Sequence, residues 1–180
     1  MISGADMEQM FLPLKRYAQF TGRSRRTEYW LWFLFQVMAS LVFSILAMMI
    51  GDIAVTLNRL FSLAILLPTL AVAVRRFHDI NRTGWWVLFP MAVFLVAMIV
   101  YLSMNGANFM SQMTLLGSLG PKPTPQQITA VLPVILSMMW ILLAYLAAAI
   151  VTLVFNVMDG TPGPNRFGPD PKGRGNVNVF

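Results

Sequence analysis

This sequence has unusually few charged residues. Only 11% of its 180 residues are charged and 57% are hydrophobic, whereas soluble domains average about 25% charged and roughly 45–50% apolar residues. A chain with so few charged side chains cannot cover a water-facing surface with polar groups. The composition therefore predicts an integral membrane protein, and the length predicts a single domain.

Cysteine is absent and histidine occurs once. The first absence excludes a disulfide framework, a thiolate metal site and a cysteine nucleophile. A single histidine makes a zinc or haem site unexpected, because such sites use several ligands. Paired catalytic carboxylates, a P-loop and a nucleophile elbow are also missing. We therefore assign no catalytic residue, no metal and no cofactor from the sequence.

Four long apolar runs dominate the chain. At 1.5 Å per residue such runs cross a hydrocarbon core of about 30 Å, so we expect an all-α, polytopic protein with four transmembrane helices at residues 29–50, 53–74, 85–104 and 131–158. Gly51 and Asp52 predict a tight turn between the first two helices. Pro68 is expected to kink the second helix or to free a backbone carbonyl.

Three segments lie outside these runs and differ from them in composition. Residues 1–28 carry an amphipathic pattern followed by arginines, residues 105–130 are rich in Gly, Ser, Pro and Asn, and residues 159–180 are a Gly/Pro tail. We expect residues 1–19 either to lie on the membrane surface or to form a partly ordered tail, residues 105–130 to be an external loop, and residues 159–180 to be a chain of turns ordered only by docking.

The basic residues flank the apolar runs instead of forming one basic face, so the net charge of +6 does not predict nucleic-acid binding. A cytoplasmic N-terminus places eleven of the thirteen Lys and Arg residues inside and leaves only Arg59 and Lys122 outside. This agrees with the positive-inside rule. Four spans then predict that both termini are cytoplasmic.

The polar block R-R-F-H-D-I-N-R-T-G-W-W at 75–86 separates the second and third runs. If the second helix continues to about Asn81, Arg75, His78, Asp79 and Arg82 share one face, and Asp79 lies within reach of Arg75, Arg76 and Arg82. Two interpretations stay open: Asp79 is held by arginines, or Asp79 and His78 handle protons.

The predicted topology brings three polar clusters to the same membrane face. We expect segments 22–30 and 160–171 to fold onto Asp79, forming one candidate binding or structural site. Its members are Arg23, Arg25, Arg26, Glu28, Arg75, Arg76, His78, Asp79, Arg82, Trp85, Trp86, Asn165, Arg166 and Asp170. The tryptophan pair is also expected to anchor the third span at the interface.

Three segments carry a family resemblance. F-T-G-R-S-R-R-T-E-Y-W, R-R-F-H-D-I-N-R-T-G-W-W and G-T-P-G-P-N-R-F-G-P-D-P, in this order, resemble the signatures of the bacterial inner-membrane family known as domain of unknown function 805, the YhaH-like proteins. The resemblance covers nearly the whole chain and implies the inner (plasma) membrane as location. It implies no established biochemical activity.

Three classes of function remain open. The first is a non-enzymatic binding or scaffold protein whose cytoplasmic cluster engages anionic lipid headgroups or a partner protein, including a second copy in a homo-oligomer. The second is a small transporter or channel subunit, although the spans lack the buried acid or lysine that usually marks an ion path. The third is a membrane enzyme acting on a lipid-linked substrate, with Asp79 or His78 as base.

Overall fold

The computed structural model describes residues 4–174 as a helical protein with no β-strand in that range. Its elements are α1 (Gly4–Lys15), α2 (Arg26–Ile50), α3 (Asp52–Asp79), the short 3₁₀ helix η1 (Gly84–Leu88), α4 (Phe89–Gly117) and α5 (Pro125–Val157). Four helical segments, at 26–50, 52–79, 84–117 and 125–157, are long and apolar enough to cross a membrane. The prediction of an all-α protein with four transmembrane helices is confirmed.

The chain forms two compact units, residues 1–87 with 154–180, and residues 88–153. The described part of the first unit contains α1, α2, α3, η1 up to Val87, the last turn of α5 and the tail to Arg174. The second unit contains most of α4 and α5.

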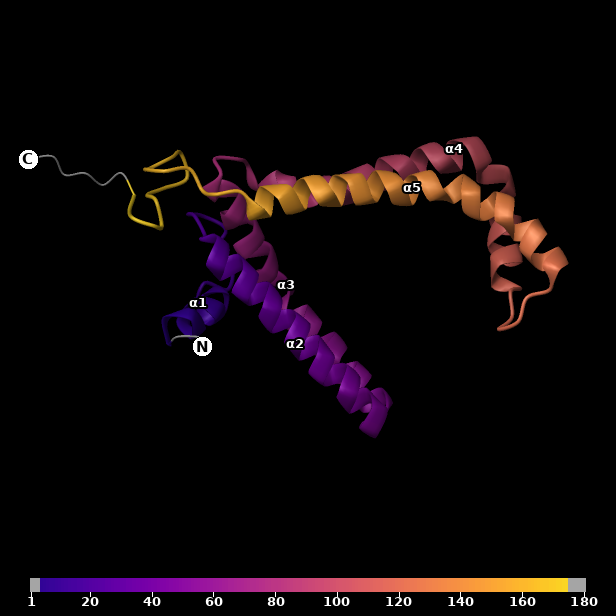
Figure 1. Ribbon diagram of the computed structural model, residues 1–180, viewed down its shortest axis with the longest axis horizontal. Helices are drawn as coiled ribbons and strands as arrows, with labels where there is room; N and C mark the ends of the chain where they lie inside the picture. The colour runs from indigo at the N-terminus through magenta and orange to yellow at the C-terminus, as the bar shows by residue number, and fades with distance from the viewer. Residues whose placement is uncertain (1–3, 175–180) are drawn as a thin grey trace, which may run out of the picture. The chain divides into compact units, whose positions relative to one another are not determined.

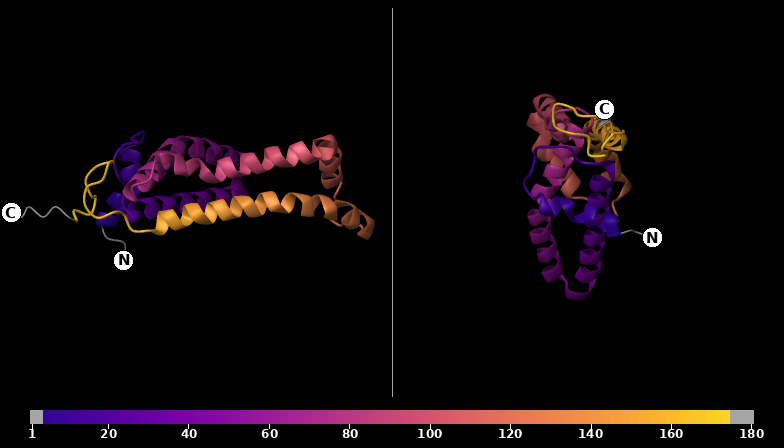
Figure 2. Two further views of the ribbon diagram at one scale, coloured as in Figure 1. Left: turned by 90° about the horizontal axis from the view of Figure 1, so that it is seen from above. Right: turned by 90° about the vertical axis from the view of Figure 1, so that its left-hand side faces the viewer.

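In the first unit, α2 and α3 form an antiparallel hairpin that turns at Gly51, as the right-hand view of Figure 2 shows. The φ of Gly51 is +57°, a left-handed value that glycine adopts without strain. This confirms the predicted turn. Between the helices, the Trp32 indole donates a hydrogen bond of 3.0 Å to the Thr69 hydroxyl, which also lies 3.2 Å from Gln36 Oε1. These polar contacts fix the register of the two helices within the apolar part of the hairpin.

The helix α1 packs against this hairpin (Figure 1). Phe11 of α1 contacts Phe35 of α2 edge to face, with 5.4 Å between ring centroids. Just beyond α1, the Tyr17 hydroxyl donates to the carbonyl of Ala64. That carbonyl would normally accept the N–H of residue 68, but Pro68 has none. The predicted free carbonyl therefore exists, and its partner is Tyr17.

In the second unit, α4 and α5 both bend (Figure 1). Tyr101 hydrogen-bonds Gln112, eleven positions later in the same helix, a pair that a straight helix would hold about 16 Å apart along its axis. Within this bend, the side-chain amide of Asn105 donates to the carbonyl of Tyr101, a side-chain bond that competes with the helical ladder. The core here is apolar: Ala97, Tyr101 and Ile141 are buried together.

The predicted loop at 105–130 is wrong, because α4 continues to Gly117 and α5 begins at Pro125. Gly, Ser and Asn disfavour a helix only modestly, and extension of a formed helix is far easier than nucleation. The start of α5 is a capping box, in which Thr124 Oγ1 accepts the N–H of Gln127 and Gln127 Oε1 accepts the N–H of Thr124. Pro125 at the first helical position fits the same signal.

Candidate functional site: a buried ion cluster and its cationic rim

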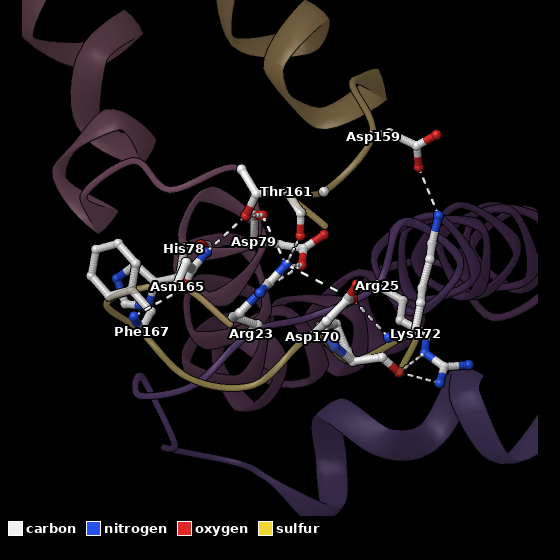
Figure 3. A network of polar contacts seen from close by, with 12 residues as sticks. Arg23, Arg25, His78, Asp79, Asp159, Thr161, Asn165, Phe167, Asp170 and Lys172 are labelled. Atoms are coloured by element: carbon white, nitrogen blue, oxygen red, sulfur yellow. Dashed lines mark hydrogen bonds and ion pairs between the residues drawn. The ribbon is translucent and has the colours of Figure 1, made fainter. Parts of the chain in front are cut away.

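Among the described residues of the first unit, six charged side chains are almost fully buried. We call them the buried ion cluster, and they are Arg23, Glu28, Arg75, Arg76, Asp79 and Asp170. They come from the segment before α2, the first turn of α2, the last turns of α3, and the tail (Figure 3 shows Arg23, Asp79 and Asp170). A buried charge is tolerated only when it is paired and hydrogen-bonded, and each of these has such partners.

Asp79 is the centre of the cluster. Its Oδ1 atom accepts from Arg23 at 2.9 Å and its Oδ2 atom from Arg76 at 2.9 Å. Gly160 lies against this carboxylate so closely that a Cβ at that position would be 2.0 Å from Asp79 Oδ2. The ion-paired interpretation of Asp79 thus has direct structural support, and no space remains at Oδ2 for a substrate atom.

The arginines of the cluster also cap helix ends. The last carbonyls of an α-helix have no partner within the helix and attract cations. Arg76 donates to the carbonyls of Phe155, Asn156 and Met158 at the end of α5. Arg75 donates to the carbonyls of Arg16 and Gln19 just after α1.

Arg23 does the same for α3. Its Nη2 atom lies 3.3 Å from the Asp79 carbonyl and 2.6 Å from that of Thr161, and its Nη1 atom donates to Gly163. The Thr161 N–H completes this end by donating to the Asp79 carbonyl at 2.9 Å. Three arginines therefore join three helix ends and the tail into one assembly.

The second buried pair is Arg75 with Glu28, at 3.0 Å. Arg75 is fully buried and lies in the last turns of α3. It does not reach Asp79, in contrast to the predicted shared face, because its guanidinium turns toward α2 and the end of α1.

Arg82 also departs from the prediction of one helical face. The helix α3 ends at Asp79, and Asn81 adopts a left-handed φ of +59°, so Arg82 leaves the helical path. Its guanidinium lies over the rings of Trp86 and Phe155, 5.0 and 4.2 Å from their centroids. Cation–π contacts of this kind take the place of an ion pair with Asp79.

His78 is held by the tail. Its Nδ1 atom lies 3.1 Å from the Gly22 carbonyl, and its ring stacks on Phe167 with centroids 3.9 Å apart and an interplanar angle of 4°. The amide of Asn165 donates to the His78 carbonyl at 2.9 Å. His78 therefore makes no contact with the Asp79 carboxylate among the bonds of residues 4–174, and the proposed proton-handling pair gains no support.

The tail docks through ionic contacts of its own. Asp170 accepts from the Arg174 side chain and the Lys172 N–H, each at 2.9 Å, and lies 3.9 Å from Arg23. Burial alone would raise the pKa of Asp170, but these hydrogen bonds and the charges of Arg174 and Arg23 lower it to about 2. A hydrogen bond from Lys172, aided by the charge of Arg26, lowers the pKa of the exposed Asp159.

Exposed and partly exposed cations near the buried ion cluster form what we call the cationic rim: Arg16, Arg25, Arg26, Arg82, Arg166 and Lys172. Arg25 donates to the Pro171 carbonyl, Arg26 pairs with Asp159 at 3.0 Å, and Arg166 donates to the Asn81 carbonyl at 3.1 Å. Trp85 is 78% exposed, whereas Trp86 packs edge to face on Phe155. The structure thus brings the three sequence clusters together. Some of their charged side chains are buried in ion pairs, and the others form the accessible rim.

Several functional contacts escaped the sequence argument. Gly160, Thr161 and Arg174 of the tail and Asn156 of α5 all contact the cluster or its partners. Residues 4–174 contain no group of three His, Asp or Glu side chains placed to hold a metal ion. The only signal for Gly160 was its position in the segment D-G-T-P-G-P, which does not reveal that its hydrogen faces Asp79.

Comparison with known proteins places the chain among inner-membrane proteins. A family model described as "Protein of unknown function (DUF805)" matches residues 17–169. The chain is 29% identical over 170 residues to "Inner membrane protein YhaH" of Escherichia coli strain K12, covering 92% of this chain and 98% of that protein. It is 33% identical over 104 residues to "Inner membrane protein YhaI" of the same strain, covering 57% of this chain and 88% of that protein. No solved structure shows significant similarity.

Proposed function

Because this chain belongs to the family described as "Protein of unknown function (DUF805)", a description that assigns no reaction, we propose its function from its side chains. It is a non-enzymatic binding protein of the bacterial inner membrane that engages anionic lipid headgroups through the cationic rim. The buried ion cluster is the rigid support of that rim. The observation that carries this proposal is the division between arginines whose charges are neutralised inside and cations that stay accessible outside.

The accessible cations are the ones that can meet a lipid. Arg25, Arg166 and Lys172 are exposed, and Arg16, Arg26 and Arg82 are partly exposed. Arg75 cannot serve, although its place in the polar block suggested it, because it is fully buried against Glu28. Basic groups near an anionic membrane surface gain about 1 kcal/mol each. The rim is therefore the part of this unit suited to an anionic surface.

The competing functions have less support. An enzyme would need Asp79 or His78 to be reachable, yet Asp79 is enclosed by Arg23, Arg76 and Gly160. A proton or ion path would normally show a buried acid within a span. The sequence has no Asp or Glu between Glu28 and Asp52, between Asp52 and Asp79, or between Asp79 and Asp159.

The proposal requires the tail and the N-terminal segment to share the cytoplasmic side. The positive-inside rule supports this orientation, and the tail and the segment before α2 meet through Arg23. Reporter fusions after residues 110 and 180 test it. We expect an external signal from the first and a cytoplasmic signal from the second; an external tail would contradict the proposal.

Lipid preference is the direct test. The purified full-length protein is mixed with phosphatidylglycerol and phosphatidylethanolamine, and bound lipids are counted by native mass spectrometry. We expect preferential retention of phosphatidylglycerol that weakens with added salt, because exposed charges are screened. Equal retention of both lipids would refute lipid engagement and leave a partner protein as the alternative.

A further inference from the structure

A cleft of about 270 Å³ opens beside the buried ion cluster in the first unit. It lies between α1, the start of α2 and the tail. Its walls are formed by Gln9, Leu12, Arg16, Arg23, Arg25, Glu28 and Pro171. Three arginines and one carboxylate thus face a single concavity, and the balance of charge favours an anion.

The charges of this cleft are unequally satisfied. Glu28 is ion-paired with Arg75, and Arg23 is ion-paired with Asp79. The charges of Glu28 and Arg23 are therefore already neutralised. Among residues 7–174, no hydrogen bond or ion pair involves the Arg16 side chain, and its backbone carbonyl accepts from Arg75. Within the described residues, the Arg25 side chain bonds to the neutral carbonyl of Pro171 and to no carboxylate. Arg16 and Arg25 therefore carry positive charge into the cleft without a counter-charge.

The surroundings add two features that suit a phosphate. Arg25 is the N-cap of α2, so the cleft is at the positive end of a helix, where phosphates bind favourably. The Pro171 carbonyl accepts from both Nε and Nη2 of Arg25, which shows that the guanidinium fork already points at an acceptor oxygen. A guanidinium fork matches the spacing of phosphate oxygens.

The depth of the cleft agrees with a lipid headgroup. Arg25 immediately precedes the first residue of α2, whereas Phe35, against which Phe11 of α1 packs, lies about 14 Å farther along the helix. Placing the Phe11–Phe35 contact among the acyl chains, where an apolar contact is at home, puts the beginning of α2 at the level of the headgroups.

We propose that the Arg16–Arg25 cleft is a specific site for one phosphate group, supplied by the phosphodiester of an anionic lipid. This rests on the proposed function and locates it at one position, because it assigns the phosphate contacts to Arg16 and Arg25 and not to the rim as a whole. The tail carbonyl at Pro171 occupies the place that a phosphate oxygen takes when the lipid binds.

The test compares two charge-matched double variants of the full-length protein. Arg16→Gln with Arg25→Gln empties the cleft of its free cations, whereas Arg166→Gln with Lys172→Gln removes the same charge from residues outside it. Phosphatidylglycerol binding is measured by native mass spectrometry. We expect the cleft variant to lose at least about tenfold more affinity than the control, which loses only the general attraction of two rim cations.

The single variant Arg16→Gln guards against loss of folding, because no described contact of its side chain is removed. It is expected to weaken phosphatidylglycerol binding severalfold with unchanged thermal stability. Equal losses in the two double variants would overturn the cleft while leaving rim binding intact. Absence of any preference for phosphatidylglycerol in the wild type would instead refute the proposed function itself.

A second arm identifies the source of the phosphate. Isothermal titration with inorganic phosphate and with glycerol 3-phosphate, in neutral detergent, measures binding without a lipid. We expect at most weak, millimolar binding that the cleft variant loses. Tight binding of the soluble phosphates, together with no effect of the cleft variant on phosphatidylglycerol, would overturn the lipid source.

Discussion

The two units of this protein bury different chemistry. The first encloses a network of arginines, carboxylates and helix-end carbonyls around Asp79. In the second, residues 88–153, the buried side chains are Ala97, Tyr101, Val131, Val134, Ile141 and Ala148, of which only Tyr101 has a polar group. Apolar contacts are non-directional and tolerate volume-conserving change, whereas buried charges demand every partner. The first unit should therefore be fragile at single positions where the second is tolerant.

The largest effect is expected from Asp79→Asn. The change leaves Arg23 and Arg76 buried without their carboxylate, and breaking a buried pair in this way costs roughly 3–5 kcal/mol. Thermal unfolding in detergent measures it. The control Asp52→Asn changes an exposed acid at the opposite end of the same helix and should alter stability by less than about 0.5 kcal/mol. A stable Asp79→Asn protein would remove the claim that this carboxylate organises the first unit.

Gly160→Ala is expected to cost about 1–3 kcal/mol, as overpacking of a tight site does. Its methyl group would lie 2.0 Å from Asp79 Oδ2, so either the tail or the carboxylate must move. The matched control in the second unit is Gly106→Ala, where a Cβ meets nothing within 4 Å. That change should be neutral or slightly stabilising, since alanine is the better helix former. Thermal unfolding of both variants measures this difference. Similar unfolding midpoints would contradict the expected difference between the two units.

A smaller effect should come from Tyr17→Phe, which removes the donor to the carbonyl freed by Pro68. We expect a loss of about 1 kcal/mol of unfolding free energy. In a Pro68→Ala background the same change should cost less, because the alanine N–H can bond the Ala64 carbonyl. A double-mutant cycle on unfolding free energies measures this coupling. Zero coupling would mean that Tyr17 stabilises α1 by packing alone.

The smallest effect expected is local release of the tail in acid. Because the pKa of Asp170 is lowered to about 2 in the folded protein, its ionised form stabilises docking above its ordinary pKa near 3.9. This stabilisation is lost as pH falls through about 2. Pepsin cleavage within 159–174 should therefore increase between pH 4 and pH 2, before α4 and α5 are cut. Asp170→Asn should be cleaved readily across that range, and pH-independent cleavage of the wild type would contradict the assignment.

Much of this architecture follows from local sequence signals. Hydrophobic length predicts the four spans, Gly51 predicts the hairpin, and Pro68 predicts a free carbonyl. The grouping of segments around Asp79 follows from charge-based topology together with helical spacing. The loop prediction at 105–130 failed because Gly, Ser and Asn lower helix stability too little to end α4, and because the Thr124–Gln127 capping box starts α5 early.

The sequence by itself determined that this is a helical membrane protein with few charged residues, and it determined which charged residues are available. Only the tertiary structure decided which charged side chains are buried in ion pairs and which are exposed. Arg75 and Arg76 are adjacent and chemically identical, yet one turns to Glu28 and the other to Asp79 and the end of α5. Burial and partner choice depend on helices that are distant in sequence, and only folding brings those partners within hydrogen-bond range.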